Sequence, residues 1–221
     1  MAESAKDAIL VRIRTALSGT SDARADAPAE AAAAAMPRAY RQQDARNQTE
    51  IVAELIDRLR DYKAHVDHVE PAALAEAIAH ACAAYGIRRL VVPADVPAEW
   101  LPAGVEALRD DPPLTNAQLD ESDGVLTGCA FAIAQTGTIM LDGGAQQGRR
   151  ALSLVPDRHL CVVRADQVVG IVPEGISRLA AHPTRPITFI SGPSATSDIE
   201  LSRVEGVHGP RTLHVLLVVE G

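Results

Sequence analysis

Aromatic residues are scarce in this chain. They make up 3% of its 221 residues, and Trp100 is the single tryptophan, whereas hydrophobic residues as a whole make up 47%. The core must therefore consist of Ala, Val, Leu and Ile. A core of this kind is typical of helices packed on a buried parallel sheet, whose strands are continuous aliphatic runs. The length allows one or two domains and is enough to bury a full core.

Cysteines are also few. Cys82, Cys129 and Cys161 are widely spaced, and no Cys-x-x-Cys motif occurs. An odd count without motif spacing argues against a disulfide framework. Because a cubane iron–sulfur cluster is held by four thiolates, this chain alone cannot hold one in that way. We interpret each cysteine as a small, buried hydrophobic residue.

The chain lacks both an excess of positive charge and a long apolar run. Its 21 Lys and Arg residues against 29 Asp and Glu residues give a net charge of −8, so nothing favours nucleic-acid binding, although a local arginine and glycine site can still hold a small anionic molecule. No apolar run approaches the roughly 20 residues of a membrane span. Charged residues, among them Lys6 and Asp7, interrupt the first apolar residues and argue against a signal peptide. We therefore expect a cytoplasmic protein.

Hydrophobic patterning divides the chain into three parts. Residues 1–17 carry apolar side chains at helical spacing and predict a short amphipathic helix. Residues 18–47 are rich in alanine and nearly free of large apolar side chains, which predicts a flexible linker. The N-terminal helix is thereby detached in sequence from the main domain, residues 48–221. We expect its apolar face to pack on its own protein, for instance in a homo-oligomer, or on another protein.

Within the main domain, helical periodicity alternates with short aliphatic runs. This alternation predicts an α/β fold: a Rossmann-like, mostly parallel sheet flanked by helices, with an added β-hairpin region. Thr49 is a candidate cap for the first helix. The predicted helices begin near residue 48 and span 71–86, 98–108 and 167–181, and Pro173 indicates that the regular part of the last helix starts there. The predicted strands span 64–69, 89–93, 159–163, 187–190 and 213–219.

The stretch 130–141 lies at the centre of this pattern. Two apolar runs flank Gln135, Thr136, Gly137 and Thr138. Such a sequence predicts an ordinary hairpin. It is also compatible with a turn that cradles a ligand, because two hydroxyls flank a glycine that can adopt a positive φ. The sequence alone leaves both interpretations open.

A second polar stretch follows the predicted strand 187–190. In open α/β sheets, ligands lie just beyond the carboxyl ends of strands. Serine hydroxyls and free backbone N–H groups suit a phosphate or a carboxylate, and carboxylates suit acid/base catalysis. The alternative is a capped turn, in which Ser and Asp bond the local backbone. The polar residues concerned are Ser191, Gly192, Ser194, Asp198 and Glu200.

A third polar stretch, residues 206–211, precedes the last strand. Arg211 can bind a planar anion through two hydrogen bonds, and His208 can act as a general acid or base near neutral pH. Arg149 and Arg150 face either the same ligand or water. The weak catalytic candidates are thus His208, Asp198 and Glu200, and no metal site is predicted. The candidate anion- or substrate-binding residues are Thr136, Gly137, Thr138, Ser191, Gly192, Ser194 and Arg211.

Five motifs together carry a resemblance to a known family. Residues 134–138, 152–159, 190–194, 197–200 and 206–211 occur in the order and spacing of the lactate utilization protein C family, which the chain resembles from about Gln48 to Val219. The resemblance implies a fold similar to the group of ribose-5-phosphate isomerase, glucosamine-phosphate deaminase and CoA-transferase. It also implies a cluster-free subunit that acts beside two iron–sulfur partner subunits in the oxidation of L-lactate to pyruvate. The clusters are then expected in the partners, and no cofactor in this chain.

Two departures from the family pattern limit the chemistry. Gln135 stands where the family usually has glutamate, and an amide cannot be a carboxylate nucleophile or a base. Ala195 stands where a basic residue is common, so one anion contact is missing. Two alternatives remain open: a stand-alone enzyme acting on a phosphosugar or CoA thioester, by analogy of fold, and a non-catalytic assembly or regulatory protein. Whether the chain itself catalyses a step is left undecided.

Overall fold

The computed structural model describes residues 5–18, 35–36, 39–193 and 209–219. The chain forms two compact units, Met1–Tyr40 and Arg41–Gly221. The first contains the predicted N-terminal helix, α1 (Ala5–Ser18), whose Ile9 and Ile13 side chains are exposed. No helix in the described part of the chain combines the length and apolar character that crossing a bilayer requires.

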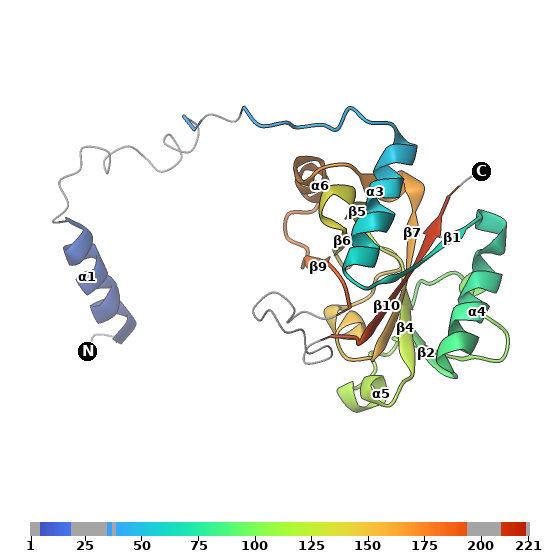
Figure 1. The fold of residues 1–221 in the computed structure, drawn as a ribbon. Helices are drawn as coiled ribbons and strands as arrows, with labels where there is room; N and C mark the ends of the chain where they lie inside the picture. Colours follow the sequence, from blue (N-terminus) through green and yellow to red (C-terminus); the bar gives the residue numbers. More distant parts are fainter. Residues whose placement is uncertain (1–4, 19–34, 37–38, 194–208, 220–221) are drawn as a thin grey trace. The chain divides into compact units, whose positions relative to one another are not determined.

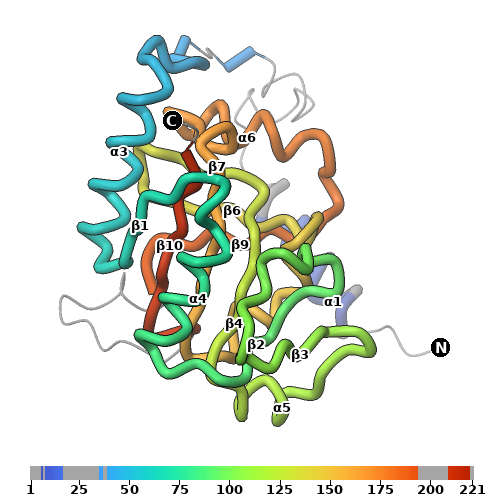
Figure 2. The backbone as a smooth tube through the Cα atoms, turned by 90° about the vertical axis from the view of Figure 1, so that its right-hand side faces the viewer, coloured from blue at the N-terminus to red at the C-terminus, as the bar shows by residue number. Residues whose placement is uncertain are grey.

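A six-stranded, wholly parallel sheet forms the centre of the second unit (Figures 1 and 2). Its strand order is β1-β10-β7-β4-β2-β3. The adjacent inner strands β10 and β7 pair along their whole length, and their aliphatic side chains are buried on both faces, as expected for a parallel sheet. The strands are β1 (His65–Val69), β2 (Arg89–Val92), β3 (Glu106–Arg109), β4 (Gly124–Thr127), β7 (Arg158–Arg164) and β10 (Thr212–Val218).

A second, four-stranded sheet is inserted between β4 and β10 in the chain. It consists of β5 (Phe131–Ile133), β6 (Thr138–Leu141), β8 (Val168–Val169) and β9 (Thr188–Ile190), in the order β8-β5-β6-β9. Strands β5 and β6 form an antiparallel hairpin around the 3-10 turn Ala134–Thr136. The prediction of an added hairpin region on a mostly parallel α/β fold is therefore confirmed.

Helices α3 (Gln48–Asp61) and α4 (Leu74–Tyr85) cover opposite faces of the parallel sheet (Figure 1). Leu55 and Leu59 of α3 are buried with the inner face of the second sheet, and Ile78 of α4 is buried on the other side. Two short helices, α5 (Asn116–Asp120) and α6 (Val172–Leu179), complete the fold, and α6 packs on the outer face of the second sheet.

Three local predictions were wrong. Residues 98–108 form a single 3-10 turn, Ala98–Trp100, and then the edge strand β3, because Pro102 and Gly104 interrupt the expected helix. Residues 167–171 are not helical, since Val168–Val169 form strand β8, and the helix starts at Val172, next to Pro173, where the sequence places the start of its regular part. Asn47, not Thr49, caps α3 through a capping box with Glu50.

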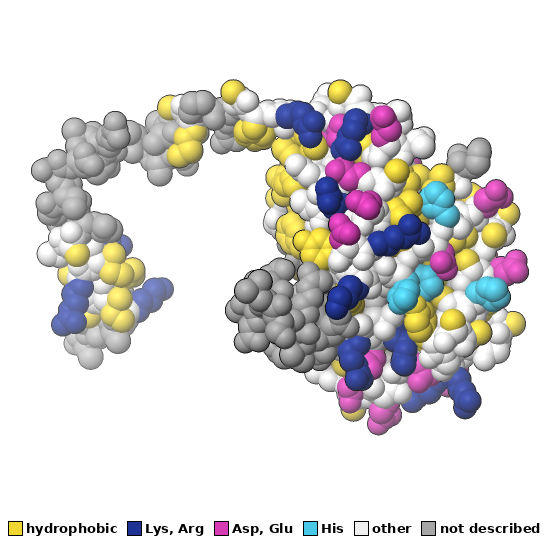
Figure 3. Space-filling view, in the orientation of Figure 1, with side chains coloured by type: hydrophobic (Ala, Val, Ile, Leu, Met, Phe, Trp, Pro, Cys, Tyr) yellow, Lys and Arg dark blue, Asp and Glu magenta, His cyan; other side chains and the backbone are white. Residues whose placement is uncertain are grey.

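The predicted buried strand 187–190 is an edge strand instead. Among the described strands, β9 pairs with β6 alone, in antiparallel fashion, and Phe189 is 58% exposed. Hydrophobic side chains gather at the surface along α6, β9 and the loop between them (Figure 3). Since β9 belongs to the second sheet, residues 191–193, the described residues that follow it, do not lie beyond the carboxyl ends of the parallel sheet.

Candidate functional site

Three of the predicted site hydroxyls form a continuous row. The Oγ1 atoms of Thr136 and Thr138 are 2.8 Å apart, and the Oγ1 atom of Thr138 is 2.8 Å from the Oγ atom of Ser191. Thr138 is buried, whereas Thr136 and Ser191 are half-buried. We call these three side chains the hydroxyl row. Each hydroxyl has one donor and two acceptor positions, so the two ends of the row retain capacity for a further polar partner.

The hairpin and its neighbouring strand bring the hydroxyl row together. Ile139 pairs with Ile190 in the β6–β9 ladder, so Ser191 lies beside Thr138 although 53 residues separate them. Gly137 has a φ of 58° and turns the chain between the two threonines. A Cβ atom at Gly137 would lie 2.7 Å from the Cβ atom of Arg58 on α3. The glycine is therefore required by the turn and by the close contact with α3.

A small pocket adjoins Ser191. Its volume is about 50 Å³, and its lining includes Arg150, Ser153, Gly192 and Gly209. Both glycines have positive φ values, 100° and 95°. Within the described residues, no carboxylate pairs with the exposed guanidinium of Arg150. We call this the Arg150 pocket.

The other two candidate arginines are engaged elsewhere. Arg149 donates to the Asp110 carboxylate, with Nε 2.8 Å from Oδ2, and to the carbonyl of Leu114. Arg211 pairs with Asp157, whose carboxylate raises the pKa of the guanidinium. Within the described ranges, the cation that lies at the Ser191 pocket without a carboxylate partner is therefore Arg150, whereas Arg211 is paired.

The pocket lies at the amino ends of two parallel strands. Pro210 precedes β10, and the 3-10 turn Arg150–Ser153 precedes β7. The expectation that Ser191 follows the carboxyl end of a parallel strand is therefore wrong. The antiparallel pairing of β9 reverses its direction, and this pairing is a tertiary contact that the sequence pattern does not reveal.

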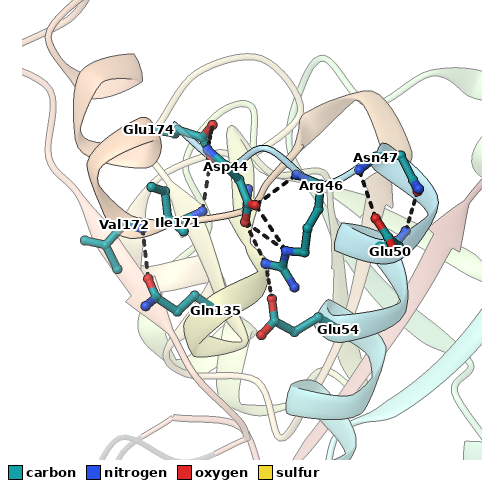
Figure 4. A network of polar contacts seen from close by, with 10 residues as sticks. Asp44, Arg46, Asn47, Glu50, Glu54, Gln135, Ile171, Val172 and Glu174 are labelled. Atoms are coloured by element: carbon teal, nitrogen blue, oxygen red, sulfur yellow. Dashed lines mark hydrogen bonds and ion pairs between the residues drawn. The ribbon is translucent and has the colours of Figure 1, made fainter. Parts of the chain in front are cut away.

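The remaining predicted residues have different outcomes. Ser194, Asp198, Glu200 and His208 lie outside the described residues. The side-chain carbonyl of Gln135 accepts from the backbone N–H of Val172 at 3.4 Å and thus faces the start of α6 (Figure 4). No group of three or more His, Cys, Asp or Glu side chains in the described ranges is arranged to hold a metal ion.

The part of the chain that carries this geometry matches a known protein family. The model of the LUD domain matches residues 52–218, most of the chain. The chain belongs to the LUD domain family. The hydroxyl row and the Arg150 pocket both lie within the matched LUD domain.

Relatives cover the same region. Lactate utilization protein C of Deinococcus radiodurans is 56% identical over 174 residues, which cover 78% of this chain and 81% of that protein. Lactate utilization protein C of Geobacillus kaustophilus is 31% identical over 181 residues, covering 71% and 74% of the two chains. The crystal structure of a DUF162 family protein from D. radiodurans has a TM-score of 0.69 at 50% identity, and it covers 78% of this chain and 99% of that one. The α/β fold is thus shared with a solved structure.

A polar network ties the start of the second unit to the LUD domain (Figure 4). Arg46 donates to the Asp44 carboxylate and, at 2.7 Å, to Glu54 of α3. Glu174 of α6 accepts from the backbone N–H of Asp44 at 3.0 Å and caps its own helix through Ile171 N–H. Gly170 leaves no room for a side chain beside Asp44. Residues 41–47, which the sequence assigns to the linker, therefore pack on the compact unit.

This network predicts a pH-dependent stability. Hydrogen bonds from Arg46 lower the pKa of Asp44 to about 2, against about 3.9 in an unfolded chain. A lowered pKa contributes stability above the unfolded value, and this contribution is lost as the pH falls toward the folded value. Asp44→Asn should therefore lower the free energy of unfolding near neutral pH. The difference in the free energy of unfolding between this variant and the wild type should become smaller as the pH falls from roughly 4 to 2, as measured by urea titrations. An equal difference at every pH would contradict this role.

Sequence reasoning missed one buried polar cluster in the LUD domain. The Nε2 atom of His159 is 2.7 Å from the Oγ1 atom of Thr127, and the Nδ1 atom has no hydrogen-bond partner among the residues that the structure describes. Next to it, the Cys161 thiol donates to the carbonyl of Gly128 at 3.8 Å, and the Cys129 thiol donates to the side-chain carbonyl of Gln167 at 3.7 Å. His159, Thr127 and both cysteines are buried, which confirms the prediction for these two cysteines. The available signal was a histidine at the start of an otherwise aliphatic strand.

Proposed function

We propose that this chain is the cluster-free C subunit of a system that oxidises L-lactate to pyruvate, together with two iron–sulfur subunits. The observation that carries the proposal is the 56% identity to lactate utilization protein C of D. radiodurans over most of both chains. The two iron–sulfur partners follow from the family resemblance carried by the five sequence motifs. The three widely spaced cysteines agree with a subunit that leaves cluster binding to its partners.

The Arg150 pocket supplies a matching anion site in this proposal. Lactate and pyruvate are both small carboxylates, and a guanidinium is the side chain that binds a carboxylate through two parallel hydrogen bonds. Arg150 is an unpaired cation among the described residues, and Ser191 adds a hydroxyl at the same pocket. The volume of about 50 Å³ suits the carboxylate end of such a molecule. The hydroxyl row orients Ser191 through its contact with Thr138.

The overall reaction releases electrons, which the partner subunits must accept. Conversion of lactate to pyruvate removes the hydrogen on the carbinol carbon and the hydroxyl hydrogen, which together amount to two electrons and two protons. In this proposal the electrons pass to the iron–sulfur subunits, and the carboxylate is retained unchanged. Gln135 has no acidic group, so no covalent acyl step is assigned to this chain.

Reconstitution of the three subunits tests this function. Omission of this chain should abolish lactate-dependent reduction of an electron-accepting dye, and its addition should restore both dye reduction and pyruvate formation. The heat-denatured chain is the control for non-specific protein effects. Full activity of the two iron–sulfur subunits alone would rule out the proposed role.

A further inference from the structure

A second cavity lies at the opposite edge of the parallel sheet from the Arg150 pocket. It has a volume of about 730 Å³ and is formed where β1, β10 and β7 end and α3 begins. Its lining comes from Gln48 and Thr49 of α3, from Val218 and Val219 at the end of β10, and from Arg164 at the end of β7. We call it the carboxyl-edge cavity.

This position is separate from the hydroxyl row. Gly137 contacts Arg58 near the end of α3, whereas the carboxyl-edge cavity is lined by the first three turns of the same helix. Between residues 49 and 58 an α-helix rises by roughly 14 Å. The carboxyl edge is also where open α/β sheets bind their ligands. The cavity is therefore not an extension of the Arg150 pocket.

The walls of the carboxyl-edge cavity are apolar. Val52, Ala53 and Ile56 form one stripe of α3, and Pro71 and Val218 face the same space. Hydrophobic side chains are visible at the surface between α3 and β1 (Figure 3). A volume in this range and a mostly apolar lining are typical of sites for organic ligands of cofactor or drug size.

The polar groups of the cavity favour an acidic ligand. His68, Arg164 and Thr49 supply donors, and Asp166 is the carboxylate among the lining residues that the structure describes. Asp166 accepts from the Nε atom of Arg164 at 3.1 Å in an exposed pair, and no other carboxylate in the described ranges pairs with this guanidinium. No glycine occurs in the described lining, so the backbone cradle that binds a chain of phosphates is missing there.

We propose that the carboxyl-edge cavity binds an organic anion with an apolar or aromatic body, whose acidic group is held by Arg164. The body fills the space against Val52 and Ile56, and the acidic group lies at the polar mouth. This site goes beyond the proposed lactate function and does not depend on it, since the Arg150 pocket lies at the other edge of the sheet. The two proposals can fail separately.

Two fluorescent probes of matched shape test the site in the full chain. 8-Anilinonaphthalene-1-sulfonate carries an acidic group, and N-phenyl-1-naphthylamine is its neutral counterpart. Ala53 is exposed on α3 and lines the cavity, so the indole of Ala53→Trp should obstruct the apolar wall and weaken both probes at least about tenfold. Ala75→Trp is the matched control, because Ala75 is exposed on α4 outside the cavity lining. Unchanged probe binding by Ala53→Trp, with binding by Ala75→Trp equal to wild type, would overturn the site.

Charge variants test the class of ligand. Arg164→Gln should weaken the acidic probe by about fivefold and leave the neutral probe unchanged, as expected for a partly exposed ion pair. Asp166→Asn should strengthen binding of the acidic probe, because it releases Arg164 from its own pair. Equal effects of Arg164→Gln on both probes, or weaker acidic binding by Asp166→Asn, would overturn the assignment of an anion. Circular dichroism of each variant confirms that the fold is retained.

Discussion

Gly137→Ala should lower the free energy of unfolding by roughly 3 kcal/mol. Gly137 has a φ of 58°, and a non-glycine residue in this left-handed region costs about 1–2 kcal/mol. The new Cβ atom would also lie 2.7 Å from the Cβ atom and 3.1 Å from the carbonyl carbon of Arg58. Overpacking of this kind costs about 1–3 kcal/mol. Urea unfolding of the full chain, followed by circular dichroism, measures the sum.

Gly86→Ala is the matched control for this substitution. Gly86 ends α4 with a φ of 65°, close to that of Gly137, but a Cβ atom there would meet nothing within 4 Å. Its substitution should cost only the conformational part, about 1–2 kcal/mol. If the two variants lose equal stability, the contact between the hairpin turn and α3 contributes nothing, and Gly137 is needed only for its φ angle.

Arg150→Ala should weaken the binding of small anions about tenfold to a hundredfold. A hydrogen bond to a charged group contributes about 1.5–3 kcal/mol, and Arg150 is the unpaired cation of its pocket in the described chain. Calorimetric titration of the wild type and the variant with lactate, pyruvate and inorganic phosphate measures the change. Because the side chain is exposed, the thermal unfolding midpoint should stay the same.

Arg211→Ala distinguishes Arg150 from Arg211, the arginine that the sequence predicts to bind the anion. Arg211 is paired with Asp157 in an exposed ion pair, so its removal should leave anion affinity nearly unchanged. Arg149→Ala is a less suitable control, because its bonds to Asp110 and to the Leu114 carbonyl hold a loop. Loss of anion binding in Arg211→Ala, with full binding by Arg150→Ala, would reverse the assignment.

Local patterns predicted much of the fold. Aliphatic runs marked β2, β7 and β10, because strands buried on both faces carry no polar alternation. Gly86 marked the end of α4, where the structure has the left-handed residue that a helix end favours. In the site, the pattern of Thr136, Gly137 and Thr138 indicated crowded hydroxyls at a turn, and the hairpin has this geometry. These features depend on residues close together in the chain.

Features that depend on pairing between distant segments were not predictable. The sequence predicts β9 as a strand of the parallel sheet. In the structure it is the exposed edge strand of the second sheet and pairs with β6 in antiparallel fashion. The length and composition of a three-residue strand do not encode its partner or its direction. The sequence also does not show which arginine is available to bind an anion. Arg150 and Arg211 are both plausible by residue type, and the structure shows that Arg211 is paired with Asp157.

By itself the sequence determined an aliphatic α/β domain, because residue type and periodicity are local properties. It also predicted crowded hydroxyls at the turn around Gly137, and its five motifs carried the resemblance to the lactate utilization protein C family. Only the tertiary structure decided that Ser191 completes the hydroxyl row, that Arg150 lies beside it with no carboxylate partner among the described residues, and that α3 and three strand ends line a separate cavity. Each of these depends on the register between strands or on competition between charged groups. Both are set by the packing of the whole domain rather than by any one segment.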